Sequence, residues 1–392
     1  MATQRPKIDP ADLPGLGAPL SEQEARAQQA ARNFVRENVL PSIEEWFEEG
    51  VFPRELVGEL GKLGVLGMHL QGYGCAGAGA ISYGLTCLEF EAGDSGLRSF
   101  ISVQGSLAMF PIWMYGSEEQ KEHFLPAMAA GEMIGCFGLT EPDVGSDPGS
   151  IKTRARKAGR DWVLDGHKRW VTNGSIADVA VVWAMTEEGI RGFLVPRGTP
   201  GFATSDIKHK WSLRASVSSE ITLSSCRLPA EAVLPGVVGL RGPLSCLNEA
   251  RYGIIWGALG AARACYEAAL SYAVERQQFG KAIAAFQLTQ AKLADMALEV
   301  EKGLLLAYHL GRLKEAGRLT PEQVSLGKLN STREALKIAR TARTVLGANG
   351  VTLEHPVIRH AANLESVLTY EGTAEIHQLT IGRALTGSSA FA

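Results

Sequence analysis

The sequence predicts an α+β fold in which a small β-sheet domain lies between two helical domains. Apolar residues recur at helical spacing before about residue 133 and again after about residue 239, whereas the stretch between them holds short apolar or alternating runs broken by glycines. The length of 392 residues exceeds one ordinary hydrophobic core. We therefore expect three domains: a helical domain at 1–133, a β-sheet domain at 134–238 and a helical bundle at 239–392.

Helix-start signals order the N-terminal domain. Ser21-Glu22-Gln23-Glu24 is a capping box and predicts a helix that runs to about Glu49. Ser117-Glu118-Glu119-Gln120 is a second capping box, and its helix is expected to end near Gly131. Three further helices are expected between these two, one from Pro53, one over 81–91 and one over 97–115.

Alternating hydrophobicity marks the middle domain. Residues 160–172 nearly alternate around Asp165-Gly166, which predicts a β-hairpin with its turn at that dipeptide. Short β-type runs follow at 179–185, 192–195 and 221–223. Strands of this length and spacing favour a small antiparallel sheet.

The C-terminal domain returns to helical periodicity. Thr320-Pro321-Glu322-Gln323 places a cap, a proline at the first helical position and a glutamine at the third, so a helix begins there. The other helices are expected at about 243–278, 285–317 and 374–386. Long helices joined by short connections predict a four-helix bundle.

Composition argues against several functional classes. Hydrophobic residues make up 45% of the chain and charged residues 21%, as in soluble globular proteins. The net charge of −3 argues against a nucleic-acid partner, and no stretch of about 18 apolar residues predicts a membrane span. The first residues hold no apolar leader, so we expect a cytoplasmic protein. Six scattered cysteines are typical of reduced thiols, and the eight histidines show no metal-ligand spacing, so no metal site is expected.

Two segments of the middle domain could bind a cofactor. The loop from Phe137 to Asp147 offers glycines, Thr140 and Ser146, whose N–H and hydroxyl groups can bind a heteroaromatic edge or a pyrophosphate. Trp170-Val171-Thr172-Asn173 could pack an indole on a ring system. An ordinary turn and a core tryptophan are the alternatives for these two segments.

Three segments of the C-terminal domain also contain residues that could serve either structure or function. Gly280, in Arg276-Gln277-Gln278-Phe279-Gly280-Lys281, could cap a helix, and the glycines of 347–350 allow close backbone approach. Arg251 would need an acidic partner if it is buried, and Glu371 is a candidate. Glu371 itself lies in Tyr370-Glu371-Gly372-Thr373, at the start of a helix that Thr373 caps.

These motifs, in this order, resemble those of the acyl-CoA dehydrogenases. The resemblance covers the chain from about Leu20 to Phe391, and its α–β–α order agrees with the fold of that family. Each motif alone is weak evidence for the family, but the occurrence of all of them in this order is specific for it. Within the family, segments 72–77, 94–99, 102–104 and 247–253 resemble the branch that oxidises glutaryl-CoA.

The resemblance implies a flavoenzyme. It implies FAD as cofactor, glutaryl-CoA as acyl-CoA substrate, crotonyl-CoA and carbon dioxide as products, an electron-transferring flavoprotein as acceptor, and a homotetramer. A dehydrogenase that does not decarboxylate, or that acts on another short acyl-CoA or acyl-carrier thioester, is the alternative within the class. A non-catalytic helical assembly protein is the alternative outside it, and a flavin spectrum would exclude that alternative.

The resemblance also implies roles for single residues. Glu371 corresponds to the base that removes the acyl α-proton, and Glu91 belongs to the network around the cation Arg98. The implied substrate contacts are Arg98, Ser99, Ser146, Leu247, Asn248, Arg251, Tyr370 and Gly372. The implied FAD contacts within one subunit are Phe137, Leu139, Thr140, Gly145, Ser146, Trp170, Val171, Thr172, Thr373, Glu375 and Phe391. The implied FAD contacts to a neighbouring subunit are Arg276, Phe279, Gln287, Gly347, Asn349 and Gly350. The chain departs from the family pattern at Leu97, Phe100, Ile101 and Ala348.

Overall fold

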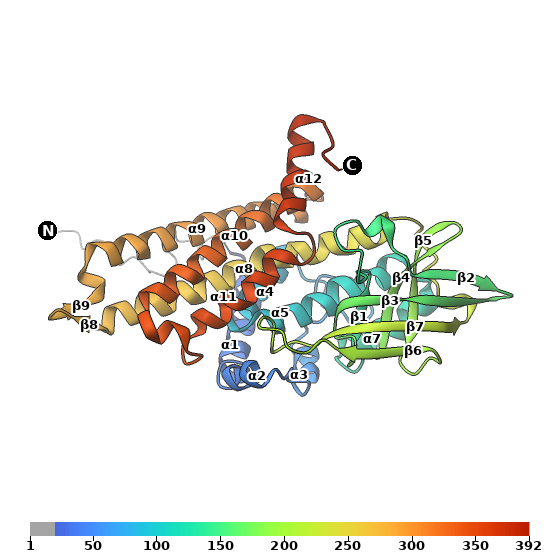
Figure 1. The fold of residues 1–392 in the computed structure, drawn as a ribbon, viewed down its shortest axis with the longest axis horizontal. Helices are drawn as coiled ribbons and strands as arrows, with labels where there is room; N and C mark the ends of the chain where they lie inside the picture. The colour runs from blue at the N-terminus through green and yellow to red at the C-terminus, as the bar shows by residue number, and fades with distance from the viewer. Residues whose placement is uncertain (1–19, 392) are drawn as a thin grey trace.

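The computed structural model describes residues 20–391 as an elongated molecule with a β sheet at one end and long helices at the other (Figure 1). The first residues, from which we expected no leader segment, lie outside this range. Within it, no helix combines the length and hydrophobicity that a membrane crossing needs. The α–β–α order is confirmed. The predicted domain boundaries fall between α7 and β1 and between β7 and α8, and they stay a prediction.

The N-terminal region consists of short helices. They are α1 (Glu22–Asn38), α2 (Ile43–Glu49), α3 (Leu56–Lys62), α4 (Ala80–Gly93), α5 (Ser95–Ser102), α6 (Phe110–Tyr115) and α7 (Glu118–Ala129). Both predicted capping boxes, at Ser21 and Ser117, are present. The single helix expected to run to Glu49 is wrong: it breaks between α1 and α2 around Pro41, which cannot continue a helix. The helix expected over 97–115 is continuous but contains a π-helical stretch at Val103–Met109.

The middle region is a mixed sheet in the order β1-β4-β2-β3-β7-β6, with β5 paired to β4. The strands are β1 (Gly135–Gly138), β2 (Arg154–Ala158), β3 (Asp161–Thr172), β4 (Val179–Thr186), β5 (Gly189–Pro196), β6 (Phe202–Asp206) and β7 (Ser218–Leu228). Most pairs are antiparallel, as expected. However, β4 pairs in parallel with β1 and β2, so the purely antiparallel prediction is wrong.

The hairpin predicted at Asp165-Gly166 is also wrong. Strand β3 runs straight through this dipeptide, and its register with β7 shifts between Leu164 and Gly166. Gly166 serves close packing, because a Cβ there would lie 2.4 Å from Oγ1 of Thr153. The turn before β3 lies instead at Gly159, whose φ is +67°.

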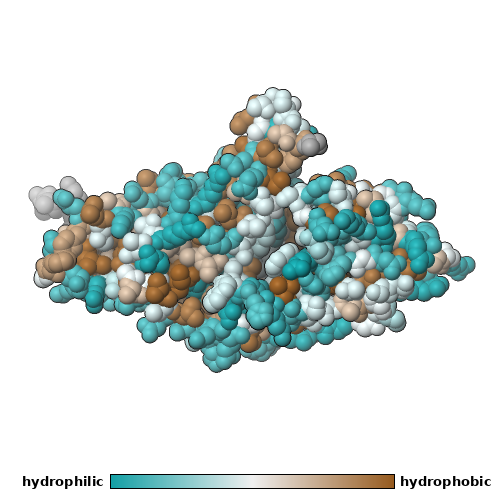
Figure 2. Space-filling model, in the orientation of Figure 1, coloured by the Kyte–Doolittle hydropathy of each residue, from teal (hydrophilic) through white to brown (hydrophobic). Residues whose placement is uncertain are grey.

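The C-terminal region is a bundle of α8 (Arg241–Glu275), α9 (Gln287–Glu315), α10 (Pro321–Val345) and α11 (Pro356–Thr369). The capping box predicted at Thr320 is present. The fourth bundle helix is α11, which the sequence analysis missed. The helix that was expected there, α12 (Ala374–Thr386), projects from the body in Figures 1 and 2.

Gly280 does not cap α8, which ends at Glu275. The chain instead forms the hairpin of β8 (Gln277–Gln278) and β9 (Lys281–Ala282). Phe279 and Gly280 lie at its turn with φ of +53° and +79°, the left-handed pair that a tight hairpin requires. Short 3₁₀ turns complete the structure at Pro148–Ser150, Ala230–Ala232, Ile283–Ala285 and Gly347–Val351.

A buried polar network joins the three regions beside the start of α5. Asp94 caps α5 by accepting from the Gly96 N–H at 2.6 Å, and it pairs with Arg359 of α11 at 2.7 Å. Asn363 donates to the same carboxylate at 2.9 Å and accepts from the Leu213 N–H at 2.7 Å. Because an unpaired buried charge is costly, this network fixes α5 against α11 and against the loop that precedes β7.

Candidate active site

Glu371 lies in the turn between α11 and α12. Its φ is +55°, a left-handed conformation that is rare for a residue with a side chain, and Gly372 follows at +102°. A Cβ on Gly372 would lie 3.0 Å from Nε2 of His377, so this position needs glycine for space as well as for conformation. Thr373 caps α12, as predicted, by accepting from the Ile376 N–H at 3.4 Å. The turn therefore holds a carboxylate in a strained, densely packed backbone.

Arg98 is brought to this turn. Its guanidinium is almost fully buried and donates from Nε to Glu91 at 2.5 Å and from Nη2 to the Tyr370 hydroxyl. Ser95 also donates to Glu91, at 2.9 Å, and the Ser99 hydroxyl lies 3.4 Å from that of Tyr370. Burial, the largest single effect, would lower the pKa of Arg98, but Glu91, Tyr370 and the weaker charges around them together raise it, and the net shift is upward. The segments around 98 and around 370, both of which carry implied substrate contacts, touch each other.

Glu371 is half-buried as a residue, and its carboxyl oxygen Oε2 is inaccessible to solvent. Oε2 has no hydrogen-bond partner among the described residues. Burial raises the pKa of Glu371 because desolvation disfavours the charged form, and the positive charges of Arg98, Lys328 and Arg251 oppose that rise only in part. A carboxyl group with a raised pKa and a free oxygen can accept a proton from a bound molecule.

Lys328 of α10 was missed by the sequence analysis. Its side chain is fully buried, and Nζ donates to the carbonyl oxygens of Tyr370 at 2.6 Å and Gly372 at 2.7 Å. Burial lowers its pKa to about 7, against the opposing effect of Glu371. A signal existed: Lys328 continues the apolar face that Val324 begins and Ala335 extends, at spacings of four and then seven residues.

Arg251 does approach Glu371, although not as expected. Its Nε donates to the backbone carbonyl of Glu371 at 2.7 Å, and Nη1 donates to Asn248 at 3.1 Å, so the acidic partner predicted for it is replaced by neutral oxygens. Burial lowers the pKa of Arg251. Leu247 and Asn248 lie half-buried on the same helix, α8.

The loop after β1 and the end of β3 hold the second group of residues that the sequence analysis expected at the site. Trp170 has a φ of +59° and is 57% exposed, so the core-tryptophan alternative is wrong. Phe137, Thr140 and Thr172 are half-buried, Leu139 and Val171 are buried, and Gly145 and Ser146 are exposed. Lys168 braces this loop from β3 by donating to Glu141 at 2.8 Å and to the Leu139 carbonyl at 3.0 Å. An exposed indole beside half-buried hydroxyls fits one face and one edge of a flat ring.

The residues expected to act across subunits lie far from this loop within one chain. Figure 1 shows the β8–β9 hairpin at the end of the bundle opposite the β sheet. Asn349 donates to the Tyr272 hydroxyl at 3.2 Å near the end of α8, so the turn at 347–351 lies at this end too. Phe279 there is 94% exposed. Of the residues expected to contact a neighbouring subunit, most are exposed at this end and Gly350 is buried. The exposed ones are Arg276, Phe279, Gln287, Gly347 and Asn349.

The remaining expected residues lie near the turn or inside the core. Glu375 is exposed in the first turn of α12, and Phe391 is 39% exposed beyond that helix. Leu97, Phe100 and Ile101 are buried on α5, and Phe100 stacks on Phe52 with ring centroids 4.8 Å apart.

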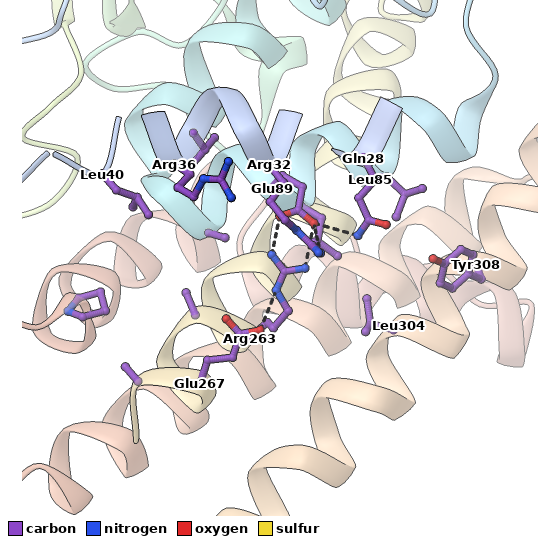
Figure 3. Close-up of a pocket in the computed structure, with 16 residues that line it drawn as sticks. Gln28, Arg32, Arg36, Leu40, Leu85, Glu89, Arg263, Glu267, Leu304 and Tyr308 are labelled. Carbon is purple, nitrogen blue, oxygen red and sulfur yellow. Dashed lines mark hydrogen bonds and ion pairs between the residues drawn. The ribbon is translucent and has the colours of Figure 1, made fainter. Parts of the chain in front are cut away.

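A pocket of about 620 Å³ between α1, α4, α8 and α9 is separate from Glu371 (Figure 3). Glu89 lies at its centre and accepts from Arg32 at 2.9 Å and from Arg263 at 2.6 Å. Because Glu89 is already paired with two arginines and none of the residues discussed above lines the pocket, it is not the candidate active site.

The three family models that match the chain follow its three regions. They are acyl-CoA dehydrogenase, N-terminal domain, over residues 21–132, the middle domain over 136–226 and the C-terminal domain over 238–386. The chain belongs to the acyl-CoA dehydrogenase family. It is an enzyme of that type, and the sequence-based resemblance is confirmed.

Relatives within the acyl-CoA dehydrogenases cover nearly the whole chain. The human short-chain specific acyl-CoA dehydrogenase, a mitochondrial protein, is 35% identical over 94% of this chain and 91% of its own. The crystal structure of glutaryl-CoA dehydrogenase from Mycobacterium smegmatis is 63% identical, with a TM-score of 0.97 over 98% of this chain and 100% of that one. A glutaryl-CoA dehydrogenase structure from the same organism, in complex with FADH2, is 59% identical with the same TM-score and coverage.

Proposed function

We propose that this acyl-CoA dehydrogenase oxidises and decarboxylates glutaryl-CoA to crotonyl-CoA and carbon dioxide. The observation that carries the proposal is the buried Arg98, which Glu91 and Tyr370 hold beside the Glu371 turn. A cation placed there suits an acyl chain that ends in a second carboxylate. The relative at 63% identity, described as a glutaryl-CoA dehydrogenase, supports the same substrate.

Glu371 is the base in this proposal. An acyl-CoA α-proton is weakly acidic, so its removal needs a carboxylate with a pKa above the reference of about 4.3. Burial provides this, because it raises the pKa of Glu371. The charges of Arg98, Lys328 and Arg251 oppose part of this rise, because they favour the ionised form of the carboxylate. The same group then returns its proton after carbon dioxide leaves.

Arg98 orients the distal carboxylate. A guanidinium has five N–H donors, of which Nε serves Glu91 and one Nη2 hydrogen serves Tyr370. The remaining hydrogens are available for a charge-assisted pair with a substrate carboxylate, whose planar geometry a lysine would not match. Ser99 and Tyr370 offer hydroxyls beside the same position.

The cofactor is FAD, which when bound accepts the hydride from the acyl β-carbon. Trp170, Thr140 and Thr172 fit the flavin ring and its polar edge, as their exposure and grouping support. We propose that Arg276, Phe279 and the turn at 347–351 contact the FAD of a neighbouring subunit in a homotetramer. An electron-transferring flavoprotein as acceptor and a cytoplasmic location complete the proposal.

Anaerobic flavin reduction tests this function. The purified protein is mixed with glutaryl-CoA, butyryl-CoA or isobutyryl-CoA, and flavin absorbance and products are followed. We expect glutaryl-CoA to reduce the flavin fastest and to yield crotonyl-CoA with carbon dioxide. Glutaconyl-CoA as the end product would establish the non-decarboxylating alternative, and faster reduction by butyryl-CoA would establish a short-chain acyl-CoA dehydrogenase.

A further inference from the structure

The backbone around Glu371 is bound by two cations from two helices. Lys328 of α10 donates from Nζ to the carbonyl oxygens of Tyr370 at 2.6 Å and Gly372 at 2.7 Å. Arg251 of α8 donates from Nε to the carbonyl oxygen between them, that of Glu371, at 2.7 Å. Three consecutive carbonyls are therefore held by positive charges.

This arrangement accounts for the strained turn. A glutamate at φ +55° occupies a conformation that persists only where the surroundings over-determine it. Lys328 binds the chain on both sides of Glu371, because it donates to the carbonyl oxygen of the preceding residue, Tyr370, and to that of the following residue, Gly372. Its side chain is fully buried, so no water competes for these hydrogen bonds.

These hydrogen bonds also determine which way the backbone N–H of Glu371 points. The peptide between Tyr370 and Glu371 is trans, since the described residues contain no cis bond. In a planar trans peptide the N–H points opposite to the C=O. Because Lys328 Nζ binds the Tyr370 C=O, the Glu371 N–H points away from Lys328. That N–H donates to no other residue within 20–391, so it is available to a bound molecule.

We propose that Lys328 is a positioning residue that aims the Glu371 N–H at the thioester oxygen and holds the Glu371 carboxylate over the acyl chain. This inference rests on the proposed function, in which Glu371 is the base. Lys328 touches neither the substrate nor the flavin; it acts through the Glu371 turn.

The charge of Lys328 adds a second effect. The groups that face it are Glu371, Arg251, Arg98, His377 of α12 and the Tyr370 ring, whose centroid lies 5.9 Å from Nζ. Lys328 is one of the charges that lower the pKa of Glu371 against burial. An uncharged residue at 328 therefore raises that pKa further, and the acid limb of the rate profile moves to higher pH.

Lys328→Met and Lys328→Gln test the inference in the FAD-loaded enzyme, with Lys337→Met as the matched control. Lys337 lies on the same helix, is exposed, and pairs only with Glu334 among the described residues. We expect both Lys328 variants to be reduced by glutaryl-CoA about 10- to 100-fold more slowly, because misplaced catalytic groups lose rates of that order. Flavin content and substrate Kd change less than about threefold, and the acid limb shifts upward. An unchanged reduction rate in either folded variant overturns the proposal.

Hydrogen exchange of the backbone gives a readout independent of activity. We expect the hydrogen-bonded amides that flank the turn, those of Tyr370, Ile376 and His377, to exchange at least about tenfold faster in the Lys328 variants, while those of α9 and all amides of Lys337→Met keep their rates. Unchanged exchange at these three amides refutes the positioning role, whether or not glutaryl-CoA is the substrate. Failure of the wild type to be reduced by any acyl-CoA would instead refute the proposed function, and the exchange result would still decide whether Lys328 holds the turn.

Discussion

Glu91 and Arg98 form a buried ion pair across the junction of α4 and α5, with Nε and Oε2 2.5 Å apart. Neither side chain is more than 1% exposed. The pair has a definite consequence for recognition: Glu91 compensates the guanidinium while the site is empty of substrate charge, and it turns the Nη edge of Arg98 toward Tyr370. A buried cation that stayed unpaired would destabilise the fold.

Glu371→Gln should abolish flavin reduction while FAD stays bound. The amide keeps the size of the side chain but cannot accept the α-proton, so we expect the reduction rate with glutaryl-CoA to fall at least about 10³-fold. Anaerobic stopped-flow absorbance measures the rate, and the flavin spectrum measures occupancy. Glu45→Gln, at an exposed position of α2 outside all of the motifs, is the matched control. Normal reduction, or loss of FAD, would assign the base elsewhere.

Arg98→Gln should separate glutaryl-CoA from butyryl-CoA. Loss of a charge-assisted pair removes about 1.5–3 kcal/mol, so we expect kcat/KM to fall about 10- to 100-fold more for glutaryl-CoA. This variant alone leaves Glu91 buried and unpaired, which destabilises the protein. The double variant Arg98→Gln with Glu91→Gln removes both charges and controls for that effect. Equal losses on both substrates in the double variant would contradict a dicarboxyl substrate.

Local signals in the sequence predicted the parts of the fold that local chemistry determines. The capping boxes at Ser21, Ser117 and Thr320 are all present, because each needs only residues three apart. Asp165-Gly166 failed as a turn because Gly166 is needed for contact with Thr153, the residue just before the neighbouring strand β2. An Asp-Gly dipeptide can therefore reflect either a turn or close packing between strands, and the sequence alone does not distinguish the two.

In the candidate site, too, the sequence predicted some residues and missed others. Motif order indicated Glu371 and Arg98, and the fold places both at Tyr370. The sequence analysis did not find Lys328, because a lysine in a helix is usually solvent-exposed, and only its place on a buried face distinguishes it. Arg251 was expected to pair with a carboxylate, and it binds a backbone carbonyl that only the folded turn presents.

The pH dependence of flavin reduction should reflect the burial of Glu371. The reaction needs the ionised carboxylate, and burial raises the pKa of that group. The rate should therefore be full above the raised pKa and fall as the pH drops through it, at a pH above the reference of about 4.3. Single-turnover reduction across pH 4–9 checks this at a fixed buffer strength. An acid limb at or below the ordinary carboxyl range would contradict the desolvated site.

Gly257→Ala should disturb the pair formed by Glu91 and Arg98. A Cβ on Gly257 would lie 2.1 Å from Oε2 of Glu91 and 3.1 Å from Nε of Arg98, so one of them must move. Overpacking of this kind costs about 1–3 kcal/mol, and we expect a lower urea midpoint together with weaker glutaryl-CoA binding. Gly382→Ala in α12, where nothing lies within 4 Å, should leave stability unchanged or slightly raised. Equal midpoints for the two variants would contradict the tight packing.

Trp170→Ala should weaken FAD binding without unfolding the protein. The indole is 57% exposed and lies outside the hydrophobic core, so its removal loses little packing within the chain. If it packs on the flavin, truncation removes a stacking contact, and we expect the Kd for FAD to rise about 10-fold while the Tm of the FAD-free protein stays within about 2 °C. Trp211→Ala is the matched control, because Trp211 is 85% exposed and belongs to none of the motifs. Fluorescence titration with FAD distinguishes the two tryptophans, and equal affinities in both variants would remove Trp170 from the flavin site.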